Sequence, residues 1–178
     1  HARAAKDRAG RVSVARETCG IVAYHAGEWK EAISELRAAR RMAGGPGLLP
    51  VLADCERGLG KPEKALDVAN DPQADQLDAE SKVELAIVVA GAHQDLGHPN
   101  DALSALEAQL ENAEAPDVTR MRLFYAYADA LLTVDRKKEA VEWFNRAAEM
   151  DTEEVLDVSD RLAELDEDQE AASQSEEK

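Results

Sequence analysis

Aromatic residues are scarce in this sequence. Two Phe, two Trp and three Tyr are present among 178 residues, whereas Ala occurs 33 times. Ala favours helices, and β-sheets depend more on β-branched and aromatic side chains. The composition therefore predicts an all-α protein whose helices pack closely. Apolar residues make up 44% of the chain, which suffices for a folded core and argues against wholesale disorder.

Long apolar runs are also missing. The longest one, Leu85–Ala92, has eight residues, far fewer than the roughly 20 that a membrane-spanning helix needs. The N-terminal residues lack the apolar stretch of a signal peptide. Cys19 and Cys55 are too few for a disulfide framework, and both are expected to be buried and inert. We expect a cytoplasmic protein without a membrane segment. The Ala- and Arg-rich composition is typical of a bacterial protein.

Positive charge is in deficit. The chain has 21 Lys and Arg against 37 Asp and Glu, a net charge of −16, which disfavours a nucleic-acid binder. Residues 1–64 carry 12 basic and 8 acidic side chains, a net charge of +4. Residues 65–178 carry 9 basic and 29 acidic side chains, a net charge of −20. Residues 167–178 are interpreted as an acidic tail in solvent, with an interaction tail as the alternative.

A four-fold internal repeat organises the sequence. The segments GEWKEAI, GKPEKAL, GHPNDAL and DRKKEAV begin at Gly27, Gly60, Gly97 and Asp135. Each has a turn residue and, five positions later, an Ala followed by an aliphatic residue. These alanines are Ala32, Ala65, Ala102 and Ala140. Apolar helical patterns lie on both sides of each segment, so one repeat is predicted to be helix, turn, helix, with the Ala where the two helices cross.

The repeat resembles the tetratricopeptide repeat (TPR) over roughly residues 11–151. The first unit carries the best match, with Gly20, Tyr24, Gly27, Trp29 and Ala32. The second and third units are degenerate and longer, which predicts extra loop residues near Asn70–Asp78 and Asn112–Asp117. The resemblance implies a right-handed α-solenoid of antiparallel helix pairs whose first helices line a concave, peptide-binding face.

Four segments follow from this pattern. Residues 1–10 are expected to be the end of a truncated preceding repeat, and residues 11–151 to form four TPR-like helix pairs. Residues 152–166 are expected to form a capping helix with an apolar stripe that includes Val155 and Leu165. Residues 167–178 are the acidic tail.

The resemblance to the TPR family also implies which residues line the concave face, and these residues define a candidate groove. Two of its members, Tyr24 and Tyr125, are amphipathic anchors of the sort enriched at binding hot spots. The lining residues are Glu17, Ile21, Tyr24, Asp54, Arg57, Glu84, Ile87, Arg122, Tyr125 and Asp129, with Asp95 and Leu132 beside them. The aliphatic members are expected to be exposed, unless they belong to the core.

The chemistry of this lining limits its ligands. Some TPR proteins hold a terminal carboxylate with Lys, Asn and Arg, but Glu17, Ile21 and Asp54 stand near those places here. We therefore expect a protein or peptide ligand with apolar anchors and neutral or basic flanks. A second candidate surface is basic and comprises Arg37, Arg40 and Arg41. Complementing a helix dipole is its simpler interpretation, and binding an acidic partner is the alternative.

Catalytic and metal-binding patterns are not recognisable. None of His1, His25, His93 and His98 has a partner three or four residues away, as a zinc pair on a helix would. No cofactor, metal or catalytic residue is predicted. The expected function is a non-catalytic protein- or peptide-binding scaffold or adaptor. One alternative is a sensing, regulatory or self-association module of a longer protein, which would form a homo-oligomer if it self-associates. The other alternative is an enzyme built on a helical-repeat frame.

Overall fold

A computed structural model describes residues 2–153 and 155–166, which are helical and contain no strand. The helices are α1 (Ala2–His25), α2 (Trp29–Ala43), α3 (Leu49–Gly58), α4 (Pro62–Ala69), α5 (Ala79–Asp95), α6 (Pro99–Glu107), α7 (Asp117–Thr133) and α8 (Lys137–Met150), with a 3₁₀ turn η1 (Ala74–Gln76). A final helix covers residues 158–166. No described helix is long and apolar enough to cross a membrane.

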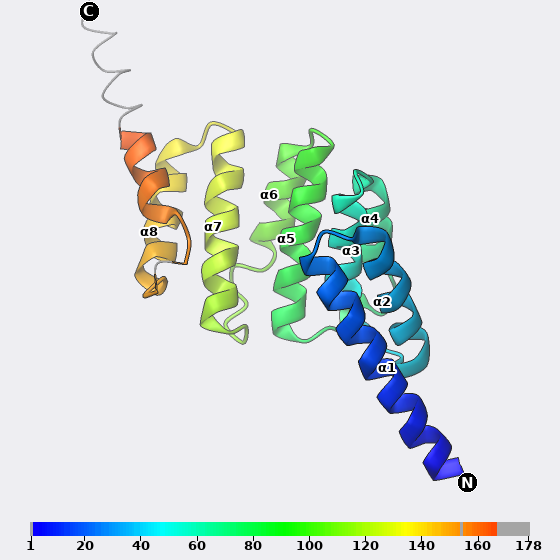
Figure 1. Ribbon diagram of the computed structural model, residues 1–178. Coiled ribbons are helices and arrows are strands. Elements are labelled where there is room, and N and C mark those ends of the chain that lie inside the picture. The colour runs from blue at the N-terminus through cyan, green and yellow to red at the C-terminus, as the bar shows by residue number, and fades with distance from the viewer. Residues whose placement is uncertain (1, 154, 167–178) are drawn as a thin grey trace, which may run out of the picture.

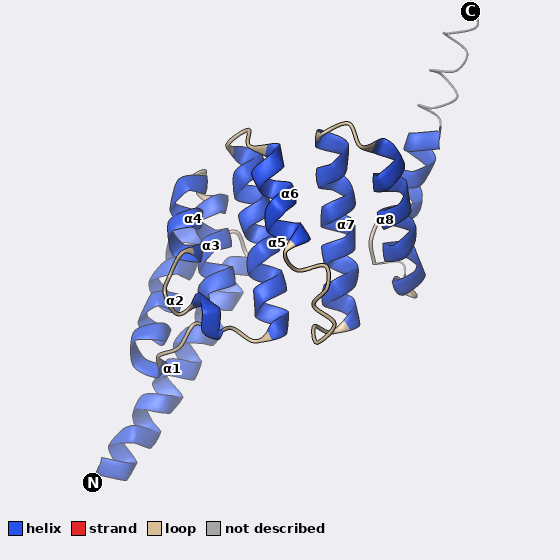
Figure 2. Ribbon diagram, turned by 180° about the vertical axis from the view of Figure 1, so that it is seen from behind, coloured by secondary structure: helices blue, strands red, loops and turns tan. Residues whose placement is uncertain are grey.

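The helices form a two-layered array. Consecutive helices pair as α1 with α2, α3 with α4, α5 with α6, and α7 with α8. Neighbouring pairs stack through contacts of α3 with α5 and of α5 with α7. The first helices therefore form one layer and the second helices the other (Figure 1), and the opposite view shows the same order (Figure 2). This arrangement is the predicted all-α solenoid.

One turn geometry joins the helices of every pair. Gly27, Gly60, Gly97 and Asp135 have φ angles of 74°, 71°, 74° and 61°. In each turn the next backbone N–H reaches a carbonyl five residues earlier, as in the bond from His98 to His93 of 2.8 Å. This is one of the bonds of a Schellman motif, which ends a helix with a residue of positive φ. Asp tolerates that conformation better than most residues with a side chain.

Small residues lie where the paired helices approach one another. Ala32, Ala65, Ala102 and Ala140 are at most 1% exposed, in agreement with the prediction. Gly20 has the same role on α1. A Cβ atom added there would be 2.6 Å from Cγ of Leu36 on α2. The repeat motif is therefore a consequence of close helix packing.

The final helix is shorter than predicted. It begins at Val158 instead of Thr152, because the Asp151 carboxylate accepts backbone N–H bonds from Val155 and Leu156, both of 2.8 Å, and holds this segment in a turn. Val155 is 68% exposed and does not belong to the apolar stripe. Val158 and Leu165 of this helix are buried in the same core cluster as Phe144 of α8.

The first ten residues also differ from expectation. Residues 2–10 belong to α1, which runs without interruption from Ala2 to His25 and includes Gly10. No residue of positive φ interrupts the described part of this segment, residues 2–10. Cys19 is exposed, contrary to prediction, whereas Cys55 is buried. The predicted loop at Asn70–Asp78 lies between α4 and α5, and the other loop begins earlier, after Glu107. The predicted acidic tail, 167–178, lies outside the described residues.

Candidate functional site

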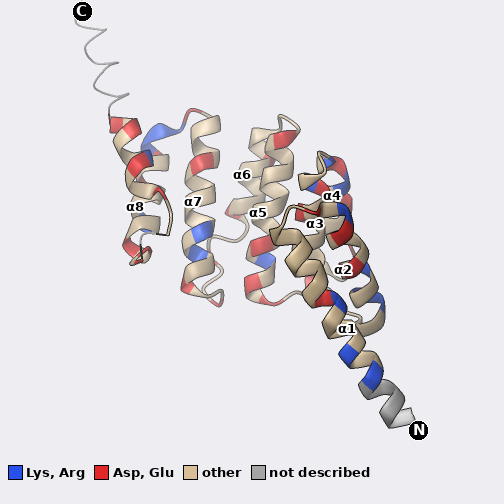
Figure 3. Ribbon diagram, in the orientation of Figure 1, with Lys and Arg blue, Asp and Glu red and all other residues tan. Residues whose placement is uncertain are grey.

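All ten predicted groove residues lie on the first helices. Glu17, Ile21 and Tyr24 are on α1, Asp54 and Arg57 on α3, Glu84 and Ile87 on α5, and Arg122, Tyr125 and Asp129 on α7. We call the side of the solenoid that carries them the first-helix face. Acidic and basic residues both occur along α5 and α7 (Figure 3).

Hydrogen bonds connect this face from the first repeat to the third. The Tyr24 hydroxyl of α1 donates a 2.7 Å bond to Asp54 Oδ2 of α3. Arg57, one turn further along α3, donates to Asp54 Oδ1 at 3.1 Å and to Asp95 Oδ2 of α5 at 2.7 Å. Each bond between helices joins residues 30 or 38 positions apart, which is close to one repeat.

Three separate pairs follow toward the C-terminal end of this face. Arg122 of α7 donates a 2.6 Å bond to Glu84 Oε1 of α5. The Tyr125 hydroxyl donates to Asp157, and Arg161 of the final helix donates to Asp129. We call this series the polar ladder. Its members are Tyr24, Asp54, Arg57, Glu84, Asp95, Arg122, Tyr125, Asp129, Asp157 and Arg161.

The polar ladder has an acidic excess, with five carboxylates and three guanidinium groups. Burial raises the pKa of Glu84, and the charge of Arg122 opposes that rise only in part. Burial and the hydrogen bond to Asp157 raise the pKa of Tyr125 to about 12. Burial, with the bond to Asp54, also raises the pKa of Tyr24. Around neutral pH both phenols are therefore protonated hydrogen-bond donors to carboxylates.

The structure brings seven of the ten predicted groove residues into the polar ladder. Glu17 is exposed on α1 outside it. Ile21 and Ile87 are half-buried and pack against core clusters, so they offer less apolar surface than expected. Asp157 and Arg161 were not predicted. Their positions 32 residues after Tyr125 and Asp129 fall within the 30 to 38 residues that separate the earlier pairs and could have indicated them.

The predicted basic surface is largely occupied by ion pairs. Arg37 contacts buried Glu56 of α3 at 3.0 Å, and Arg40 contacts Asp71 at 2.9 Å. Arg40 also donates to the Gln73 side chain and the Gly45 carbonyl. A backbone N–H of Gln73, assisted by Arg40, lowers the pKa of Asp71. Arg37 and Arg40 therefore tie the first repeat to the second, while Arg41 has no ion pair within the described residues.

Two histidines for which the sequence predicts no shared site, His93 and His98, lie close together. One ligand atom each of His93, His98 and Asp101 falls within 4.8 Å of the others. His25 is on another helix, with its ring centroid 5.2 Å from that of Tyr24. His93 and His98 are five residues apart, because a turn lies between them. The three- or four-residue spacing of a metal-binding pair on one helix therefore does not identify them.

Comparison with known proteins defines the fold. No protein-family model and no curated protein matches the sequence. Among solved structures, the chain is similar to TPR-like repeats of a Podosopora anserina putative kinesin light chain, with TM-score 0.68 and 16% identity over 95% of this chain and 92% of that one. A variant of that protein gives TM-score 0.68 and 15% identity over 95% and 91%.

A third similar structure is the TPR2AB domain of yeast Sti1 in a complex with pHSP90. Its TM-score is 0.54 and its identity 16%, over 80% of this chain and 78% of that one. The chain is therefore a TPR-like helical-repeat protein by fold.

Proposed function

We propose that the first-helix face binds an extended peptide or partner segment with apolar anchors and basic or neutral flanks, as a non-catalytic scaffold or adaptor. The polar ladder is the observation that carries this proposal. It presents hydrogen-bond donors and acceptors on all four first helices and on the final helix. One TPR neighbour, Sti1, was solved in a complex with pHSP90.

The ion pairs of the polar ladder are partly exposed, so a ligand can break one of them at a small cost in free energy. The side chains of Arg57 and Asp95 are 34% and 43% exposed, and pairs of that kind contribute at most about 1 kcal/mol. A Lys or Arg of a ligand can therefore replace a ladder arginine at its carboxylate. The excess of two carboxylates and the exposed Glu17 favour basic over acidic ligands.

The experiment selects peptides from a displayed library on the whole chain and measures their affinity by fluorescence anisotropy. The test variant carries Glu17→Lys and Asp95→Lys on α1 and α5. The matched control carries Glu63→Lys and Glu142→Lys, which make the same charge change at exposed positions of the second helices α4 and α8. Circular dichroism checks that both variants fold.

We expect the selected peptides to contain apolar residues flanked by Lys or Arg. Their affinity should fall at least about tenfold in the test variant, because it removes two carboxylates and adds two like charges. The control should keep its affinity within about twofold. Equal losses in both variants would indicate general attraction to an acidic protein, and unchanged binding in the test variant would remove the first-helix face as the site.

Self-association is the second candidate function, supported by exposed apolar residues on α1. Val12 and Val22 are 41% and 63% exposed, and Cys19 between them is exposed. Their spacing of seven and three residues places all three on one side of the helix. If α1 packs on a second copy, Val22→Glu should reduce the mass measured by light scattering at high protein concentration. Deletion of residues 167–178 tests the separate possibility that the acidic tail docks on a neighbouring molecule.

A further inference from the structure

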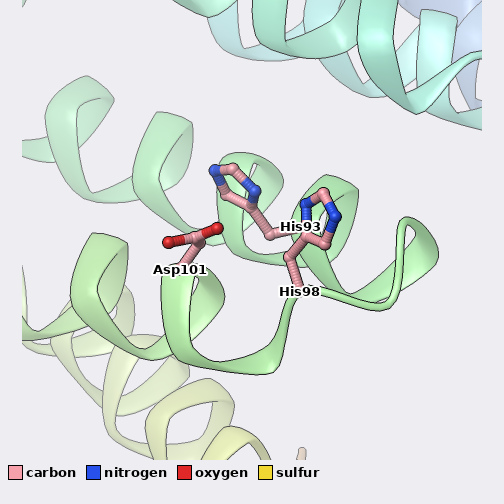
Figure 4. Close-up of side chains that lie close together, drawn as sticks. All are labelled: His93, His98 and Asp101. Atoms are coloured by element: carbon pink, nitrogen blue, oxygen red, sulfur yellow. The ribbon is translucent and has the colours of Figure 1, made fainter.

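We propose that the turn between α5 and α6 binds a divalent transition-metal ion, such as Zn²⁺, through His93, His98 and Asp101. His93 lies in the last turn of α5, His98 is the N-cap of α6, and Asp101 lies in the first turn of α6. Figure 4 shows the two imidazole rings turned toward each other, with the Asp101 carboxylate beside His93. Two imidazoles and one carboxylate form a ligand set that suits Zn²⁺ and similar ions better than Mg²⁺.

Backbone hydrogen bonds hold these residues in place. The His98 N–H donates to the His93 carbonyl at 2.8 Å, and the Gly97 N–H donates to the Gln94 carbonyl at 2.9 Å. These are the two bonds of a Schellman motif. The Ala102 N–H then donates to the His98 carbonyl at 3.1 Å and starts α6. The backbone is therefore organised before any ion binds.

Only side-chain rotations are needed to close the site. Ligand atoms on one tetrahedral Zn²⁺ are about 3.3 Å apart, given bonds of about 2.0 Å. The three candidate atoms are already within 4.8 Å of one another. His98 and Asp101 are exposed and make no side-chain hydrogen bond within the described residues, so their rotation breaks no such contact. Three protein ligands would leave a coordination position for water.

The other repeats serve as internal comparisons because they share the turn. In the fourth repeat, Arg136 and Glu139 occupy the places of His98 and Asp101, and their side chains meet at 2.6 Å. In the first repeat, the neighbouring Glu28 carboxyl group at the first of these places raises the pKa of Glu31 at the second. The turn therefore brings N-cap and third-position side chains together. Only the third repeat has ligand residues at both of these places and also at the position four residues before the turn residue, where His93 lies.

The environment of His93 gives an independent reason for a bound ion. Its Nδ1 atom is buried and has no hydrogen-bond partner among the described residues. A buried polar atom without a partner is destabilising by about 1–3 kcal/mol. A cation bound at Nδ1 of the neutral imidazole would supply the missing partner. The ring centroids of His93 and His98 are 6.2 Å apart, so both imidazoles can face one ion.

The test titrates Zn²⁺ into the whole chain by calorimetry, with Mg²⁺ as the comparison ion. We expect one Zn²⁺ site that His98→Ala and Asp101→Asn each weaken at least about tenfold, as even the loss of an outer-shell partner commonly does. His25→Ala and Glu28→Gln are the controls and should bind as the wild type does. His98 makes no capping hydrogen bond, so its removal should leave the turn folded.

Nuclear magnetic resonance locates the ion directly. Zn²⁺ should shift the imidazole signals of His93 and His98 and leave those of His25 in place. Undiminished Zn²⁺ binding in His98→Ala, or equal binding of Zn²⁺ and Mg²⁺, would assign the ion to other carboxylates and overturn the proposal. Shifts confined to His25 or to His1 would do the same. None of these outcomes bears on peptide binding by the first-helix face.

Discussion

The guanidinium group of Arg57 lies against the backbone of Gly91 in the next repeat. A Cβ atom added to Gly91 would be 2.8 Å from Arg57 Cζ. This close approach lets an arginine of α3 cross α5 and donate a 2.7 Å hydrogen bond to Asp95. Gly91 therefore maintains a contact of the polar ladder, a role distinct from the packing role of Gly20 in the first pair.

Gly91→Ala should separate stability from the geometry of the first-helix face. Replacing Gly by Ala inside a helix adds about 1 kcal/mol of intrinsic helix stability. The clash falls on the flexible end of Arg57, which can move away. We expect the free energy of unfolding in urea to rise by up to about 1 kcal/mol, while the contact between Arg57 and Asp95 is lost.

A double-mutant cycle measures the loss of that contact. In the wild type, Arg57→Ala and Asp95→Ala should show a coupling of about 0.2–1 kcal/mol, since both side chains are partly exposed. In the Gly91→Ala background the coupling should disappear. The same coupling in both backgrounds would show that Arg57 reaches Asp95 by another path.

Gly20→Ala should destabilise the protein, unlike the same change at Gly10. The new methyl group at Gly20 would be 2.6 Å from Cγ of Leu36, which is fully buried and cannot move aside. Overpacking of this kind costs about 1–3 kcal/mol, more than the helix propensity of Ala returns. Gly10 has no atom within 4 Å of an added Cβ, so Gly10→Ala should stabilise α1. Thermal or urea unfolding of the two variants checks both signs.

The repeat pattern predicted the solenoid because its signals are local. The turn residue indicates a tight turn, and the Ala five positions later indicates a place where two helices cross. The structure has both features in the third repeat, at Gly97 and Ala102. The pattern at Thr152 failed because Asp151 accepts two backbone N–H bonds and delays the final helix to Val158. Such capping by a side chain depends on the position that tertiary packing gives the backbone, which the local sequence pattern does not report.

The sequence predicted on which helices the candidate groove residues lie, but not the contacts that these residues make. The family's lining positions placed Asp54 and Arg122 on the first-helix face, as the structure does. The sequence did not indicate that these side chains bind across repeats, since each partner is about one repeat away. His93 and His98 were missed for a related reason, because they meet across a turn and not along one helix.

The two cysteines should differ in reactivity. Cys19 is exposed, whereas Cys55 is buried and burial, with the charges of Asp54 and Glu56, raises its pKa to about 11. The thiolate is the reactive form, so Cys55 is doubly protected. One thiol per folded chain should react with Ellman's reagent at neutral pH, and the second only in denaturant. Cys19→Ser should abolish the fast reaction; its persistence would show that Cys55 is accessible.

Alkaline pH should destabilise the fold through its three tyrosines. Burial comes first among the causes that raise all three pKa values above the ordinary 10.0, followed by hydrogen bonds to Asp54, Asp157 and Glu107. The values for Tyr125 and Tyr127 are about 12. A phenol is charged when deprotonated, so the unfolded chain releases these protons at lower pH than the folded chain. The stabilising contribution is complete below pH 10 and is lost as the pH rises toward 12.

Tyrosinate absorbance during a pH titration isolates this effect from the lysines, which ionise in the same range. The folded protein should show little tyrosinate at pH 10, and in denaturant half of the phenols should be ionised there. Tyr125→Phe should remove about one third of the total amplitude and lessen the fall of the unfolding free energy above pH 10, because one of three shifted groups is gone. A titration centred at pH 10 in the folded protein would contradict the hydrogen bonds from these hydroxyls to carboxylates and, with them, two contacts of the polar ladder.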